Sequence, residues 1–182
     1  MEQQAISELV QLSRHGDTKA FEKLAVEFQP LVFSLAFRLL CNEDDAKDVV
    51  QETFIRAWTK LNRYKSQYSF CTWIYKIAGN LCYDQLRKQK RSRCSNLSAT
   101  DLNISSLEDI ETSVINRELA HWIEYFTEAL TPKQRLVFTL RDIEGLSVDE
   151  VQAVTGLTSA KIKSNLYLAR TEIKNKLRTI SS

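Results

Sequence analysis

Residues 130–170 read LTPKQRLVFTLRDIEGLSVDEVQAVTGLTSAKIKSNLYLAR, and the order of capping residues and glycines in this stretch predicts helices joined by short turns. Thr131 and Ser147 are each followed, three positions later, by Gln or Glu, which is the capping-box pattern of a helix start. Gly156 turns the chain because glycine readily adopts the left-handed conformation that ends helices, and Thr158 can cap the helix that follows. Helix, short turn with glycine, and second helix form the helix-turn-helix arrangement.

The last helix of this stretch has an apolar stripe and a polar face. The stripe recurs at steps of three and four and is expected to face a core; it consists of Ile162, Leu166, Ala169, Ile173 and Leu177. The second helix of a helix-turn-helix places its first turns at base edges in the major groove. The residues predicted to read bases are therefore Lys161, Ser164, Asn165 and Leu168, and those predicted to hold phosphates are Lys163 and Arg170. A basic helix that closes a bundle is the alternative, but the capping pattern and the turn glycine favour DNA binding.

A second amphipathic helix is predicted from residues 72–91, TWIYKIAGNLCYDQLRKQKR. Its apolar positions have helical period and are expected to face a core: Phe70, Ile74, Ile77, Ala78 and Leu81. Its polar positions have the same period: Lys76, Asn80, Asp84, Arg87, Lys88 and Arg91. Residues 60–93 contain nine Lys or Arg and one acid, whereas an ordinary wet surface mixes both signs of charge. This face is therefore predicted to meet a polyanion.

An aromatic and polar loop, NRYKSQYS at residues 62–69, precedes this helix. Aromatic side chains beside cations are typical of proteins that stack unpaired bases while holding the backbone, so Tyr64 and Tyr68 are predicted to stack on bases. Asn80 suits an adenine edge. These features favour contact with single-stranded or melting DNA, and a solvated cationic face is the alternative.

An acidic helix is predicted in the first half of the chain. One of its faces presents Asp48, Gln51 and Glu52. Because an acidic face cannot approach DNA phosphates, the partner it suits is a basic protein surface. Trp58 and Trp122 fall on apolar stripes and are predicted to be core residues.

The composition limits which fold and which functions are expected. Of the 182 residues, 43% are apolar, and only four Gly and two Pro are available for the turns of a sheet, so an all-α fold is predicted. The first residues do not have the basic and apolar pattern of a leader, and no apolar run could span a membrane, so a cytoplasmic location is expected. Neither a metal site nor a disulfide framework is expected from the cysteine spacing: Cys41, Cys71, Cys82 and Cys94. No nucleophile and base are arranged for catalysis, so no enzymatic activity, cofactor or small-molecule substrate is expected.

Two small helical domains joined by a flexible linker are predicted. Residues 1–94 form the first domain, with helices broken near Gly16 and Cys41. Residues 95–113 contain seven Ser or Thr and two Asn, which is typical of a linker. Residues 114–182 form the second domain, which ends in the helix-turn-helix.

The stretches DDAKDVVQETFIRAW (44–58), 72–91 and 130–170, taken in this order and spacing, resemble the extracytoplasmic-function group of bacterial RNA polymerase sigma factors. The resemblance covers nearly the whole chain. It implies two helical domains that together bind core RNA polymerase and promoter DNA. The first domain would bind the polymerase clamp and would melt and read the −10 element, and the second would read the −35 element. The family usually also has an anti-sigma factor as a partner.

The resemblance implies roles for particular residues. Asp48, Gln51 and Glu52 occupy the places of the family's DxxQE, which meets the coiled coil of the clamp. The loop at 62–70 matches the one that captures a flipped −10 base. The helix that lies along the −10 element is matched at Asn80, Asp84, Arg87 and Lys88.

The recognition helix departs from the family's frequent TVKSRLHRAR, because it reads KIKSNLYLAR. Asn165 and Leu168 stand where arginine is frequent, so phosphate attraction should be weaker and base preference shifted. A stand-alone helix-turn-helix regulator and a helical adaptor remain alternative functions. A free regulator would bind duplex DNA without polymerase, whereas a sigma factor usually needs it.

Overall fold

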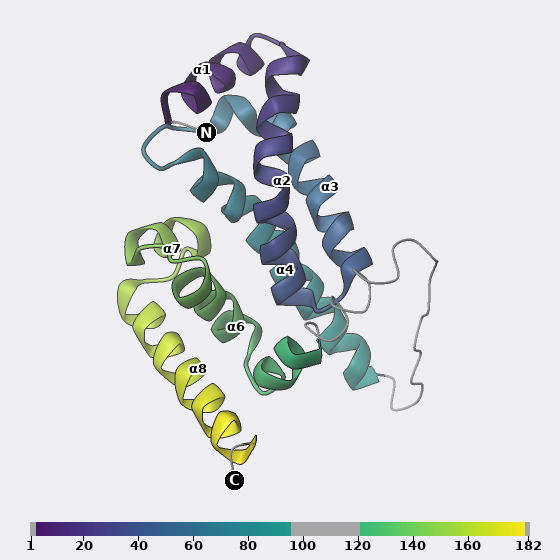
Figure 1. The fold of residues 1–182 in the computed structure, drawn as a ribbon, viewed down its shortest axis with the longest axis vertical. Coiled ribbons are helices and arrows are strands. Elements are labelled where there is room, and N and C mark those ends of the chain that lie inside the picture. Colours follow the sequence, from purple (N-terminus) through teal and green to yellow (C-terminus); the bar gives the residue numbers. More distant parts are fainter. Residues whose placement is uncertain (1–2, 96–120, 181–182) are drawn as a thin grey trace.

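The computed structural model describes residues 3–95 and 121–180, and its side chains are described up to residue 89 and from 121 to 179. Within these ranges every regular element is helical, which confirms the all-α prediction (Figure 1). Helix α4 extends through Ser95, the first residue of the predicted linker, and residues 96–113 of that linker lie outside the described residues.

The N-terminal unit consists of α1 (Gln3–Arg14), α2 (Thr18–Leu40), α3 (Glu43–Lys60), the short 3-10 helix η1 (Leu61–Arg63) and α4 (Phe70–Ser95). The breaks fall where the sequence predicted them, and each following helix has a side-chain cap. The Asp17 carboxylate accepts a hydrogen bond of 3.0 Å from the Ala20 amide, and the Asn42 side chain accepts one of 2.9 Å from the Asp45 amide. Helices α2, α3 and α4 pack around a core that includes Leu24, Leu35, Val49, Phe70 and Ile74.

The C-terminal unit contains a helical segment at residues 121–127, α6 (Pro132–Phe138), a π-helical turn η2 (Thr139–Ile143), α7 (Val148–Thr155) and α8 (Ser159–Ile180). Both predicted capping boxes are present, and Gly156 has φ 70°, so the helix-turn-helix is confirmed. The π-helical turn was not predicted. Leu177 is 49% exposed, so the apolar stripe of α8 ends earlier than its period indicates.

The two units pack directly against each other, with α6 and α7 lying along α4 (Figure 1). Gly79 of α4 lies at this contact, where a Cβ would meet side-chain atoms of Leu136 and Val154 at an ordinary van der Waals distance of 3.6 Å. Polar contacts reinforce the packing: the Thr72 hydroxyl donates to Glu150 at 3.2 Å, and the Arg135 guanidinium donates to the Leu39 carbonyl at 3.0 Å. The core residues of both units therefore form one continuous cluster.

Candidate nucleic-acid and protein interfaces

The polar face of α4 lies in solvent, as the helical period predicts. Its described members are all exposed: Lys76, Asn80, Asp84, Arg87 and Lys88. The side chain of Arg91 lies outside the described residues. On the other side of α4, Ala78 and Cys82 are fully buried. The packed C-terminal unit leaves this polar face uncovered, so a polyanion can reach it in this conformation.

The loop before α4 differs from the sequence prediction at Tyr64. Its side chain is only 8% exposed, and its ring packs edge-on against Phe70 with centroids 5.5 Å apart. The Tyr64 hydroxyl donates a hydrogen bond of 3.0 Å to the Tyr68 carbonyl. Tyr64 therefore shapes the loop and cannot stack on a base here, whereas Tyr68 is 38% exposed and remains available.

The predicted base readers of α8 lie on its outer surface. Lys161, Ser164 and Leu168 are exposed, as is Lys163, the predicted phosphate contact. Asn165 is half-buried, and its amide donates to the Lys161 carbonyl at 2.7 Å, so it must exchange this bond before it can read a base. This intrahelical bond is local and could have been expected from the spacing of four residues.

Two features of α8 were not predicted from the sequence. Arg170 donates two hydrogen bonds of 2.7 Å to the Asp142 carboxylate, and this pairing raises the pKa of Arg170 above its ordinary value. The ion pair joins α8 to η2, which the sequence separates by 28 residues. Tyr167 is 70% exposed, and its position three residues after Ser164 could have marked it as part of the same face.

The acidic face of α3 is accessible. Asp48 and Gln51 are exposed, and Glu52 is half-exposed and pairs with Arg56 at 2.6 Å. Asp45, by contrast, accepts hydrogen bonds from Gln85 and Gln89 of α4. Burial, followed by repulsion from Asp48, raises the pKa of the Asp45 carboxyl. Asp45 thus fastens α3 to α4, while the predicted clamp residues point outward.

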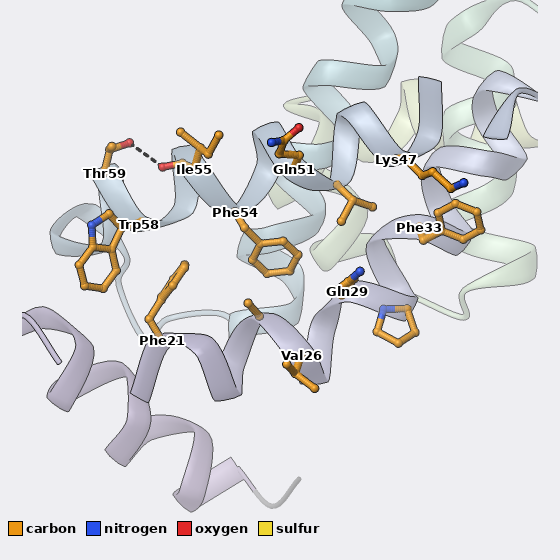
Figure 2. A pocket seen from close by; sticks show the side chains of 13 residues that line it. Phe21, Val26, Gln29, Phe33, Lys47, Gln51, Phe54, Ile55, Trp58 and Thr59 are labelled. Atoms are coloured by element: carbon orange, nitrogen blue, oxygen red, sulfur yellow. Dashed lines mark hydrogen bonds between the residues drawn. The ribbon is translucent and has the colours of Figure 1, made fainter. Parts of the chain in front are cut away.

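An apolar groove of about 870 Å³ lies between α2 and α3, directly beside this acidic face (Figure 2). Gln51 lines it together with Phe21, Val26, Phe54, Ile55 and Trp58. Trp58 is 36% exposed and Trp122 is 49% exposed, so the prediction that both are core residues is wrong. The indole of Trp58 instead packs against Phe21 at the end of the groove, with ring centroids 5.0 Å apart. Helical period predicts that these apolar side chains are buried, but none of the described helices covers the groove, so it could not be predicted from period alone.

The described thiols are suited to a structural role. Burial raises the pKa of Cys71 to about 11 and that of Cys82 to about 12, so both stay protonated at neutral pH. Within the described parts of the chain, no group of three or more His, Cys, Asp or Glu side chains is placed to hold a metal ion. None of the helices in those parts is both long enough and apolar enough to pass through a membrane.

Comparison with known proteins assigns these surfaces to two family regions. Residues 24–92 match Sigma-70 region 2, and residues 121–173 match Sigma-70 region 4. Relatives named ECF RNA polymerase sigma-E factor, from Salmonella typhimurium and Escherichia coli, are each 31% identical over 180 residues, covering 94% of this chain and 94% of theirs. The chain belongs to the extracytoplasmic-function sigma factors. The RNA polymerase sigma-H factor of Pseudomonas aeruginosa is 28% identical, covering 98% of this chain and 96% of that protein.

This sigma factor directs transcription initiation as a partner of core RNA polymerase at promoter DNA, and its family consists of transcription factors without enzymatic activity. Its fold is similar to that of CnrH in complex with the cytosolic domain of CnrY, with a TM-score of 0.72, 24% identity, and coverage of 96% of this chain and 98% of that one. It is also similar to the sigma factor RpoE of Bartonella quintana in complex with the anti-sigma factor NepR, with a TM-score of 0.67, 22% identity, and coverage of 88% and 98%. Membership of this family rules out the alternatives of a stand-alone regulator and a helical adaptor.

Proposed function

We propose that this sigma factor binds the clamp of core RNA polymerase through Asp48, Gln51 and Glu52, together with the apolar groove beside them. The three side chains lie outward on α3, and Gln51 belongs to both the polar face and the groove. A basic coiled coil with apolar residues along one edge would satisfy both halves of this surface. The groove would supply buried apolar area, and the acids would supply orientation and the rate of encounter.

The proposed −10 surface consists of the loop with Tyr68 and the polar face of α4. Asn80 and Asp84 would select bases by hydrogen bonds, while the cations Lys76, Arg87 and Lys88 would hold the phosphates of the strand that leaves the duplex. The exposure of this whole face, inside the region 2 match, supports the proposal. Tyr64 is not part of this surface because its side chain is buried.

The proposed −35 surface is the outer face of the first turns of α8. Lys161, Ser164, Asn165 and Leu168 would meet base edges, and Lys163 and Arg170 would meet phosphates. The helix-turn-helix within the region 4 match supports this assignment. Arg170 would have to exchange Asp142 for a phosphate, so its contribution should be smaller than its charge suggests.

We place the domain boundaries at residues 1–94 and 114–182 with a linker at 95–113. The structures of CnrH and of the Bartonella quintana RpoE are complexes with CnrY and with the anti-sigma factor NepR, and we propose that an anti-sigma factor binds this chain as well. The chain would act in the cytoplasm, where polymerase and promoter meet, without catalysis, cofactor or small-molecule substrate.

The observation that carries the clamp proposal is the adjacency of the exposed acids to the apolar groove. Co-purification with core polymerase tests it. The double variant Asp48→Lys with Glu52→Lys should lose at least about tenfold in affinity, because like charges would then face a basic surface. Glu8→Lys, an exposed reversal on α1 away from the groove, is the matched control and should bind normally. Undiminished binding by the double variant, with an unchanged helical circular dichroism spectrum, would exclude this face as the contact.

A further inference from the structure

The loop between η1 and α4 is held in place by an arginine of the first helix. Arg14 Nε donates a hydrogen bond of 3.4 Å to the Leu61 carbonyl, and its Nη2 donates another to the Tyr64 carbonyl. The guanidinium also lies 5.8 Å from the centre of the Tyr64 ring. Arginine suits this position because its planar fork can donate to two carbonyls and lie against an aromatic ring at the same time, whereas lysine is a single point charge.

Tyr64 extends this restraint to the far end of the loop. Its buried ring is fixed against Phe70 and Trp73, and its hydroxyl holds the Tyr68 carbonyl at 3.0 Å. The backbone is therefore tied at residue 64 by Arg14 and at residue 68 by Tyr64. The side chains that follow Tyr64 in the loop are exposed: Lys65, Ser66, Gln67 and Tyr68. Ordering a flexible backbone costs conformational entropy, so a loop that is already ordered binds a strand at lower cost.

A pocket of about 730 Å³ lies between α1 and this loop. Its polar lining is supplied by Gln3, Gln4, Ser7, Gln11, Arg14, Lys65 and Ser66, and its apolar lining by Ile6, Val10 and the Tyr64 ring. No acid occurs among the described residues that line it. Amide and hydroxyl groups can pair with the edge of an unstacked base, Ile6 can lie against it, and the ammonium of Lys65 can hold its phosphate.

We propose that Arg14 is a positioning residue for promoter melting, which holds the loop 64–68 so that loop and α1 together receive one unpaired nucleotide of the −10 strand. The inference rests on the proposed −10 function of α4 and adds an element to it. The region 2 match begins at residue 24, so α1 lies outside it. The first helix thus contributes to DNA melting by fixing the loop and by forming one wall of the pocket.

Binding of the reconstituted holoenzyme to a promoter with a premelted −10 region tests this role. Arg14→Gln and Arg14→Lys should each lower affinity about fivefold to tenfold, since misplacing the loop loses part of one base contact. Tyr64→Phe, which removes only the hydroxyl donor, should also lower the affinity for this promoter. Lys19→Gln, an exposed lysine at the start of α2, is the matched control and should stay within about twofold of the parent.

Three further measurements separate positioning from a general loss of folding. Affinity for core polymerase and for a −35 duplex should be unchanged in the Arg14 variants. A photoreactive base within the −10 strand should crosslink to residues 3–14 in the parent holoenzyme, and this crosslink should weaken in Arg14→Lys. If Arg14→Gln fails to fold, the affinity of Tyr64→Phe and the crosslink in the parent holoenzyme still test the role of α1 and the loop.

Asn80→Ala distinguishes failure of this inference from failure of the −10 assignment. If Asn80→Ala weakens binding to the premelted promoter but the Arg14 variants do not, or if no crosslink reaches residues 3–14, then the role of α1 is refuted. If neither Asn80→Ala nor the Arg14 variants have any effect, the −10 assignment itself is wrong.

Discussion

The hydroxyl of Tyr75 in α4 donates a hydrogen bond of 2.8 Å to the carboxylate of Glu144, which belongs to the C-terminal unit. The second carboxylate oxygen of Glu144 pairs with Arg38 of α2. Only 9% of the Glu144 side chain is exposed. Burial of the Tyr75 hydroxyl, together with this bond, raises its pKa far above the ordinary value, so it remains a donor at every physiological pH. One buried carboxylate thus joins two helices of the N-terminal unit to the helix-turn-helix unit.

Removing the donor should loosen the packing between the units. A hydrogen bond to a charged group contributes about 1.5 to 3 kcal/mol, so Tyr75→Phe should shift the free protein towards arrangements in which the units are separated. Small-angle X-ray scattering would detect this as a larger radius of gyration. Tyr83→Phe, at a half-buried position of the same helix, is the control. An unchanged radius in Tyr75→Phe would show that apolar packing alone holds the units together.

Substitutions at Gly79 should reveal how closely the units approach. A Cβ at this position would meet Leu136 and Val154 at 3.6 Å, which is ordinary van der Waals contact. Gly79→Ala should therefore be accommodated and should raise the free energy of unfolding by about 0.5 to 1 kcal/mol, because alanine favours the helix. Gly79→Leu should cost about 1 to 3 kcal/mol or push the units apart. Chemical denaturation of both variants measures this, and equal effects would contradict the close packing.

Mutations of base-reading residues and of phosphate-binding residues in α8 should have different effects on DNA affinity. Lys161→Ala should weaken recruitment to the preferred −35 duplex by about 1 to 3 kcal/mol and reduce discrimination among sequences, and Asn165→Ala should do the same. Lys163→Ala should lower affinity about equally on all sequences and reduce the salt slope by about one unit. Lys163 is the cleaner phosphate test because Arg170 also loses its bond to Asp142 when it is changed. Titration of holoenzyme at several salt concentrations would distinguish these classes, and a uniform effect of all three variants would argue against base reading.

The −10 residues should act on bases that are exposed during melting. Asn80→Ala and Asp84→Ala should slow open-complex formation and reduce discrimination among −10 sequences, since a lost base contact costs about 1 to 3 kcal/mol. Transcription from a template with a premelted −10 region should restore the part of the defect that comes from melting. Lys161→Ala should remain impaired on the same template. Rescue of the α8 variant, or of neither class, would refute this division between the surfaces.

The thiol of Cys82 should make stability fall at alkaline pH. Burial raises its pKa in the folded protein to about 12, whereas its ordinary value is 9.0. Above pH 9.0 the unfolded chain therefore loses a proton that the folded chain retains, and the free energy of unfolding declines as pH rises. Relative to Cys82→Ala, the parent should lose about 1 kcal/mol of stability between pH 8 and pH 10. Denaturation at both values measures this difference, and a constant gap between parent and variant would contradict it.

The sequence by itself determined the helices, their ends and the faces they expose. The caps at Asn42, Thr131 and Ser147 and the left-handed Gly156 depend on residues within one turn, so they could be predicted from spacing alone. The polar face of α4 and the outer face of α8 followed from helical period in the same way. The roles of these faces came from the family resemblance, because spacing and helical period do not specify a binding partner.

Only the tertiary structure decided which surfaces are covered and which distant groups meet. Tyr64 is buried and Trp58 is exposed, although both are aromatic residues near apolar stripes. The bonds of Arg14 to the loop and of Glu144 to Tyr75 join residues that are 47 to 69 positions apart. A side chain's burial depends on what another segment places over it, and helical period specifies the direction of a side chain but not its neighbour across the interface.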